Sequence, residues 1–109
     1  MDANAAPGSC DGQIVGQHGF DISKSTPFFR HFLEEFQLCL PCTFPCHQGP
    51  TTTWRALTGL TEHCIDFVCI PVDLLDQCSF STTVPDFDLH NGDFDHVLVA
   101  LQMGWEEYF

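Results

Sequence analysis

The sequence predicts an α+β domain, because one amphipathic helical segment is accompanied by four or five short β-prone segments. The chain has 109 residues, which suits a single domain or part of one. Hydrophobic residues make up 44% of the chain, and eleven of them are phenylalanine, so we expect a core rich in aromatic side chains.

The clearest helical signal runs from about Pro27 to Gln37. Thr26 is the expected N-cap, and Pro27 suits the first helical position. Apolar side chains recur at helical spacing and predict one buried stripe, made of Phe28, Phe29, Phe32, Leu33 and Phe36. Polar side chains between them are expected to face outward, namely Arg30, His31, Glu34 and Glu35.

The other elements are short and are interrupted by proline and glycine. Residues 1–13 and 14–20 are predicted to be loops, and residues 72–77 a helical turn. Short strands are predicted where β-branched, aromatic or apolar residues cluster, at residues 38–40, 51–56, 65–70, 78–84 (an edge strand) and 97–103. Residues 87–93 are predicted to be an acidic loop that leads to Asp95-His96 at the start of the last strand.

The charge of the chain restricts its partners. Fifteen acidic residues and three basic ones give a formal net charge of −12. Such a balance argues against a free-standing nucleic-acid binder, because phosphate contacts need Lys and Arg. It suits divalent cations, or an acidic surface that keeps the protein soluble.

The sequence also predicts an intracellular location, in the nucleus or the cytoplasm, and no membrane partner. No apolar run approaches the ~18 residues of a membrane span, and the N-terminus lacks the pattern of a secretion signal. We therefore expect the seven cysteines to be reduced, and their odd number leaves no complete disulfide framework.

One group of cysteines offers a possible zinc site. Cys39, Cys42, Cys46 and His47 have a C-x2-C-x3-C-H spacing, and further ligands would come from Cys64, Cys69 or Cys78. A small zinc-binding interaction module is therefore one hypothesis. The alternative is that cysteines in apolar segments behave as small hydrophobic residues.

Carboxylates and a histidine form a second candidate site. Asp66 lies within an apolar segment, where a lone acid costs several kcal/mol unless it is paired. His96 begins another predicted strand and is its natural partner, since a carboxylate on one ring nitrogen leaves the other for chemistry. Asp2, Asn4 and Asp95 would then be available for a divalent ion or a phosphate. If the Asp2-Ala3-Asn4 segment is extended, its two polar side chains point to the same side.

Several motifs resemble, in order and spacing, those of the endonuclease/exonuclease/phosphatase superfamily, which has the deoxyribonuclease-I-like fold. Asp2-Ala3-Asn4-Ala5 is similar to its G-D-x-N-A strand end. Three later passages resemble the endonucleases of non-LTR retrotransposons, which accompany a reverse transcriptase. These are residues 14–19 with the Phe-rich helix and Thr53-Trp54 ("IGPHG … TW"), residues 65–68 ("R-I-D-Y-I") and residues 94–96 ("S-D-H").

The resemblance implies metal-dependent hydrolysis of a phosphodiester, with nucleic acid, most naturally DNA, as the partner. Asp2 would orient the attacking water, and Asn4 would contact the scissile phosphate. Asp95 would help to hold Mg²⁺ or Mn²⁺, and His96, oriented by Asp66, would stabilise the transition state. Trp54 would pack behind the site or help to form a substrate pocket.

The chain departs from the family pattern at four positions, and it matches only half of the family domain. Met1, Cys64, Phe67 and Phe94 stand where the motifs have Gly, Arg, Tyr and Ser. Residues 1–109 match only the C-terminal half of a two-sheet β-sandwich with a flanking helix, without the N-terminal half that supplies the main metal-binding Glu. We therefore expect the isolated chain to be incomplete and inactive by itself, and the alternative to an incomplete endonuclease domain is a non-catalytic remnant of such a domain.

Overall fold

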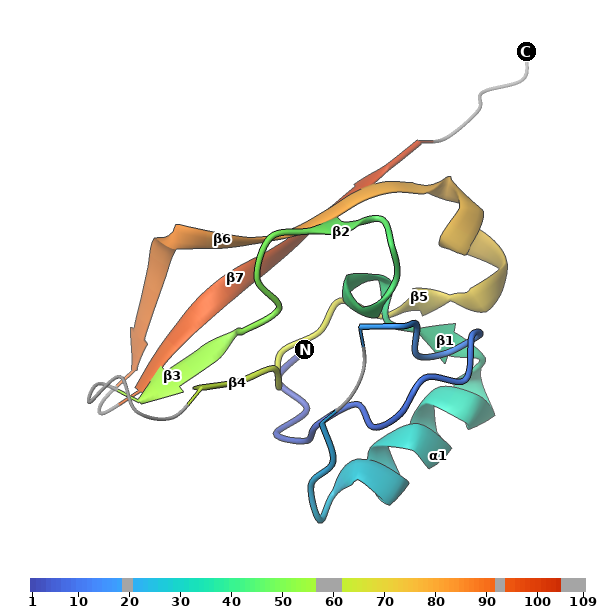
Figure 1. The fold of residues 1–109 in the computed structure, drawn as a ribbon, viewed down its shortest axis with the longest axis horizontal. Helices are drawn as coiled ribbons and strands as arrows, with labels where there is room; N and C mark the ends of the chain where they lie inside the picture. Colours follow the sequence, from blue (N-terminus) through green and yellow to red (C-terminus); the bar gives the residue numbers. More distant parts are fainter. Residues whose placement is uncertain (19–20, 57–61, 92–93, 105–109) are drawn as a thin grey trace.

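The computed structural model describes residues 1–18, 21–56, 62–91 and 94–104, with the side chains of all of these except 85–91 and 94–96. It is a small mixed α and β domain, as the predicted α+β class requires. The long β6–β7 pair runs along one side, and helix α1 with the N-terminal loops lies on the other (Figure 1).

A five-stranded sheet contains most of the regular structure. Its strand order is β2-β6-β7-β3-β4, in which β2 and β6 are parallel and the other neighbours antiparallel. The strands are β2 (His47–Gln48), β3 (Trp54–Ala56), β4 (Glu62–His63), β6 (Cys78–Asn91) and β7 (Phe94–Met103). Segments far apart in the sequence are therefore neighbours in the sheet.

A smaller layer packs beside this sheet. Strands β1 (Leu38–Cys39) and β5 (Ile70–Pro71) pair antiparallel, and each leads into a 3-10 turn, η1 (Pro41–Thr43) or η2 (Val72–Gln77). These elements confirm the strand predicted at residues 38–40 and the helical turn predicted at 72–77. Proline at position 41 ends β1, as its missing N–H requires.

Helix α1 (Thr26–Phe36) confirms the predicted helix, but the residue at its N-cap is Ser25. The Thr26 hydroxyl bonds instead to loop backbone outside the helix. Gln37 ends the helix in the left-handed region, at φ 53°.

The buried stripe of α1 is narrower than predicted. Phe29 and Leu33 are buried in the core, whereas Phe28 is 80% exposed and Phe36 is also exposed. Phe28 and Phe36, which are eight positions apart, lie on the flank of the helix that the small core does not cover. The outward position predicted for Arg30 is wrong, since its guanidinium donates to two loop carbonyls and pairs with Asp11 at 2.9 Å.

Three predictions about the second half of the chain need correction. Residues 65–69 form no regular strand; Asp66 makes a single bridge to Asp2, and only Ile70 enters a ladder. Strand β6 is longer than the predicted 78–84 and lies inside the sheet, not at its edge.

The prediction of an acidic loop at residues 87–93 is also wrong for residues 87–91, because these belong to β6. Residues 92–93 lie outside the described part of the chain. A register shift between Val84 and Asp88 lets the strand continue past the intervening proline. Asp95 and His96 consequently lie within β7 and do not precede it.

Candidate functional site

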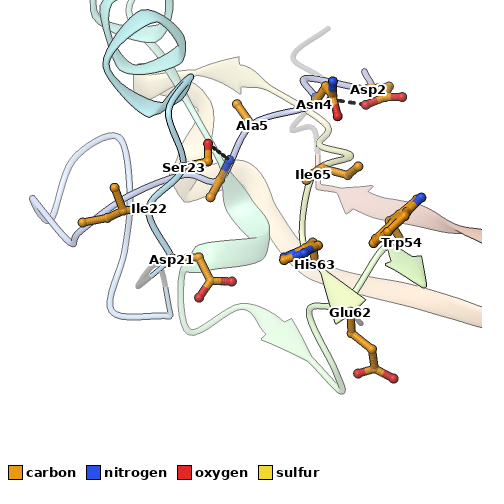
Figure 2. Close-up of a pocket in the computed structure, with 11 residues that line it drawn as sticks. Asp2, Asn4, Ala5, Asp21, Ile22, Ser23, Trp54, Glu62, His63 and Ile65 are labelled. Atoms are coloured by element: carbon orange, nitrogen blue, oxygen red, sulfur yellow. Dashed lines mark hydrogen bonds between the residues drawn. The ribbon is translucent and has the colours of Figure 1, made fainter. Parts of the chain in front are cut away.

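The main pocket of the described residues has a volume of about 720 Å³ and lies where the N-terminal segment meets the β3–β4 pair. One wall comes from residues 2–6 and 21–23, and the other from the sheet and the segment that follows it (Figure 2). Polar and charged side chains on these walls are Asp2, Asn4, Asp21, Ser23, Glu62 and His63. Trp54 and Ile65 contribute apolar surface.

The sheet wall carries a stacked aromatic pair. Trp54 and His63 are directly opposite in the β3–β4 register, and their rings stack with centroids 5.5 Å apart and an interplanar angle of 20°. Next to them, Arg55 and Glu62 form an exposed ion pair at 3.2 Å. The imidazole of His63 is exposed, so the stack presents a polar ring edge to the pocket (Figure 2).

The N-terminal wall is attached to residues 65–67 by backbone hydrogen bonds. Met1 and Phe67 exchange two, each of 2.7 Å, and the Ala3 N–H donates to the Ile65 carbonyl at 2.8 Å. This pairing places Asp2 opposite Asp66. The attachment explains why the first residues of the chain reach a pocket formed by its middle.

The backbone is not extended at Asn4, so the condition under which the Asp2 and Asn4 side chains would point to the same side is not met. Asn4 is left-handed at φ 48°, and its backbone N–H donates to Asp2 Oδ1 at 3.0 Å. This Asx-type turn holds the Asp2 carboxylate in a fixed orientation. Both side chains nevertheless line the same pocket (Figure 2).

Thr53 joins the two layers beneath the pocket. Its hydroxyl, on a residue only 1% exposed, accepts from the N–H groups of Ile65 and Asp66 at 3.0 and 2.9 Å. Its backbone N–H donates to His63, and its carbonyl accepts from Val97. One residue thus connects β4, β7 and the 65–66 segment.

The structure brings most of the predicted site residues to one region. Asp2, Asn4 and Trp54 line the pocket, and the backbone of half-buried Asp66 is bonded to Thr53 behind it. The sheet register places His96 opposite Trp54.

The remaining metal-ligand candidate, Asp95, lies opposite Arg55 in the same register. The side chains of Asp95 and His96 are outside those described, so the predicted Asp66–His96 contact stays a prediction.

Sequence reasoning missed Glu62, His63 and Asp21, which all line the pocket. No strand was predicted at residues 62–63, where the structure has β4. The sequence does contain a hairpin signal for Glu62 and His63. The β-prone segment at 51–56 is followed by a stretch that contains Gly59, and a strand that starts at residue 62 could then pair with it. No local pattern marks Asp21.

The pocket offers carboxylates, which are the ligands that Mg²⁺ prefers. Asp2, Asp21 and Glu62 all line it, and Mg²⁺ in phosphate-binding sites is commonly held by one or two carboxylates with water and substrate oxygens. Within the described ranges, however, no three His, Cys, Asp or Glu side chains are close enough to hold an ion together. The carboxylates are individually of the kind that binds Mg²⁺ or Mn²⁺, but the described residues do not gather them into a metal site, so the predicted metal, with Asp95 as its ligand, stays a prediction.

The zinc arrangement predicted from the cysteines does not form. Both ring nitrogens of His47 are occupied: Nε2 donates to the Pro50 carbonyl at 3.0 Å, so Nδ1 accepts from the Ser81 hydroxyl at 2.8 Å. Two pairs of thiols lie side by side, and buried Cys39 packs in the same cluster as Cys46 and Cys78. Cys46 lies beside Cys78, and a hydrogen bond to Cys64 together with burial raises the pKa of Cys42 well above its ordinary value.

Comparison of the chain with protein-family models, curated proteins and solved structures finds no match. The superfamily suggested by the motifs therefore stays a prediction. Within the described residues there is also no helix of the length and apolar character needed to cross a membrane.

Proposed function

We propose that the chain carries part of a metal-dependent phosphodiesterase site of the endonuclease/exonuclease/phosphatase type, with nucleic acid as substrate. The observation that supports this proposal best is that Asp2 and Asn4 line one pocket together with Trp54 and His63. The first pair comes from the D-x-N motif and Trp54 from the T-W motif. The proposed fold is the C-terminal half of the two-sheet sandwich of that superfamily.

In this proposal the residues of the chain position a phosphodiester for in-line attack by water. The Asp2 carboxylate, held by the Asn4 N–H, orients the water, and the Asn4 side chain contacts a phosphate oxygen. Asp66 orients His96, which donates to the phosphate as negative charge develops there. Bound Mg²⁺ or Mn²⁺, held through Asp95, supplies charge neutralisation at the phosphate.

The charge of the chain favours the involvement of a metal ion. Two of its three basic residues are in ion pairs, Arg30 with Asp11 and Arg55 with Glu62. Lys24, the third, is exposed and lies at a different pocket. A polyanion that approaches the acidic pocket therefore needs positive charge from a cation, or from another polypeptide.

Nicking of supercoiled plasmid DNA in the presence of Mg²⁺ tests the proposal. We expect Asp2→Asn and His96→Ala to lower the nicking rate by roughly 10²–10³-fold, the usual effect of removing one group that stabilises the transition state. His31→Ala is the matched control, because His31 is exposed on α1 and faces Glu35 at 3.7 Å. Equal nicking by all variants, or nicking that persists in EDTA, would contradict the proposal.

The second candidate function is a non-catalytic remnant of the same domain, favoured by the few basic side chains. Loss of the main groups of such a site lowers the rate by roughly 10³–10⁴-fold or more. In that case the folded wild-type chain would not nick DNA above the rate of its His96→Ala variant. Circular dichroism on the same samples separates this outcome from failure to fold.

A further inference from the structure

Two cysteine side chains that the proposed function does not use lie in contact. The Sγ atoms of Cys46 and Cys78 are 3.9 Å apart. Cys46 is half-buried, whereas Cys78 is 7% exposed and belongs to the core around β1 and η2. The pair thus combines one partly exposed cysteine with one buried cysteine.

The backbone holds these two thiols together. Cys46 immediately precedes β2, and Cys78 is the first residue of β6. The Ser81 N–H donates to the Cys46 carbonyl at 3.0 Å, and the parallel register pairs His47 with Ser81. The strands therefore hold the thiols in place, and the sulfur atoms need to approach by about 2 Å to reach bonding distance.

We propose that Cys46 and Cys78 form a redox-sensitive pair that closes to a disulfide when the folded protein meets a hydroperoxide. The Cys46 sulfur attacks the terminal peroxide oxygen, the O–O bond breaks, and an alcohol or water leaves a sulfenic acid on Cys46. The Cys78 sulfur then attacks the Cys46 sulfur and displaces water. Overall, the two thiols lose two protons and two electrons, which convert the hydroperoxide to one alcohol and one water.

The bridge would enclose the sheet wall of the pocket. The chain between Cys46 and Cys78 contains β3 and β4, and with them Trp54 and His63. Closing this loop lowers the conformational entropy of the unfolded chain, so the folded state gains stability relative to it. For a domain of this size we expect Tm to rise by about 10 °C. This consequence holds whether or not the pocket is catalytic.

A second thiol pair, Cys42 and Cys64, is the competing site. Cys42 is 3% exposed and Cys64 is half-buried, so this pair also combines a buried cysteine with a partly exposed one, and the oxidation test has to distinguish the two pairs. Burial, with the neighbouring Cys78, raises the pKa of Cys46 to about 11, which makes its oxidation slow at neutral pH and faster in alkali. The proposal for Cys46 and Cys78 therefore rests on the contact between their sulfur atoms and on the strand pairing that holds them together.

The test is oxidation of the reduced full-length chain with hydrogen peroxide, followed by alkylation, denaturation and trypsin digestion. Cleavage after Arg55 separates peptide 31–55, which contains Cys46, from peptide 56–109, which contains Cys78. We expect these peptides to be joined in the wild type and in the Cys42→Ser/Cys64→Ser control. The bridge should be absent from Cys46→Ser and from Cys78→Ser.

Fragmentation of the joined wild-type peptides identifies the bridged residues without any variant that could fail to fold. A bridge between positions 46 and 78, with the expected rise in Tm reversed by dithiothreitol, supports the proposal. The proposal is overturned if no bridge forms in the wild type, if it joins Cys42 to Cys64, or if it persists in Cys46→Ser.

Discussion

The two walls of the pocket are held by different means, although a buried threonine hydroxyl is central to each. On the sheet wall, Thr53 accepts two backbone N–H groups and also takes part in the ladders on either side. On the N-terminal wall, Thr26 accepts from the Ser23 N–H and donates to the Ala6 carbonyl, both at 2.8 Å. No ladder supports that second connection.

The difference shows where side-chain hydrogen bonds replace secondary structure. Residues 2–6 and 21–23 lie outside the named strands and helix, so their relative position depends on Thr26, on the Ser23 hydroxyl bonded to the Ala6 N–H, and on one nearby backbone bond from the Gly8 N–H to the Asp21 carbonyl. The Trp54–His63 pair has backbone pairing as well. We therefore expect substitutions to affect stability most at the sheet wall and pocket geometry most at the N-terminal wall.

The largest effect is expected from Thr53→Val. The change conserves volume but leaves two backbone N–H groups without their acceptor in a position that is 1% exposed. Each such loss costs about 1–3 kcal/mol, so the free energy of unfolding should fall by roughly 2–6 kcal/mol in denaturant titration. Thr52→Val, at a half-buried neighbour, should change it by less than about 0.5 kcal/mol. A similar small change for Thr53→Val would show that water replaces the hydroxyl.

Thr26→Val should have an intermediate effect. It removes one acceptor and one donor, and an unpaired carbonyl is tolerated better than an unpaired N–H. The free energy of unfolding should therefore decrease by about 1–2 kcal/mol. Ser25→Ala is the control, because the Ser25 side chain makes no capping hydrogen bond and should matter little. Equal losses in the two variants would mean that the helix start, and not the Thr26 hydroxyl, determines the effect.

The smallest effect concerns the backbone at Asn4. At φ 48°, a residue with a Cβ atom but no local hydrogen bond is disfavoured, so Asn4→Ala should cost about 1 kcal/mol. Asn4→Gly, which tolerates positive φ, should stay within about 0.5 kcal/mol of the wild type. Thermal unfolding of the two variants measures the difference, and an alanine variant as stable as the glycine variant would show that the turn is not maintained in solution.

Local sequence signals were sufficient to predict several short elements of this protein. The apolar spacing of residues 27–37, the proline at position 41 and the β-prone residues at 51–56 act over a few positions, and the structure has an element at each, although the strand predicted at 51–56 is limited to Trp54–Ala56. The motifs also selected Asp2, Asn4 and Trp54, which lie together at the pocket. Local propensity was sufficient in these cases because each signal acts within a single element.

Contacts between distant segments, in contrast, set which strands pair and which faces are buried. The pairing of residues 1–3 with 65–67, the continuation of β6 past residue 85 and the parallel contact of β2 with β6 depend on hydrogen bonds between distant segments. Helical spacing likewise could not distinguish the covered side chain of Phe29 from the exposed one of Phe28. The periodicity of one segment carries no information about which other segment pairs with it. The place of His63 at the pocket therefore follows from the pairing of β4 with β3, which sets it opposite Trp54.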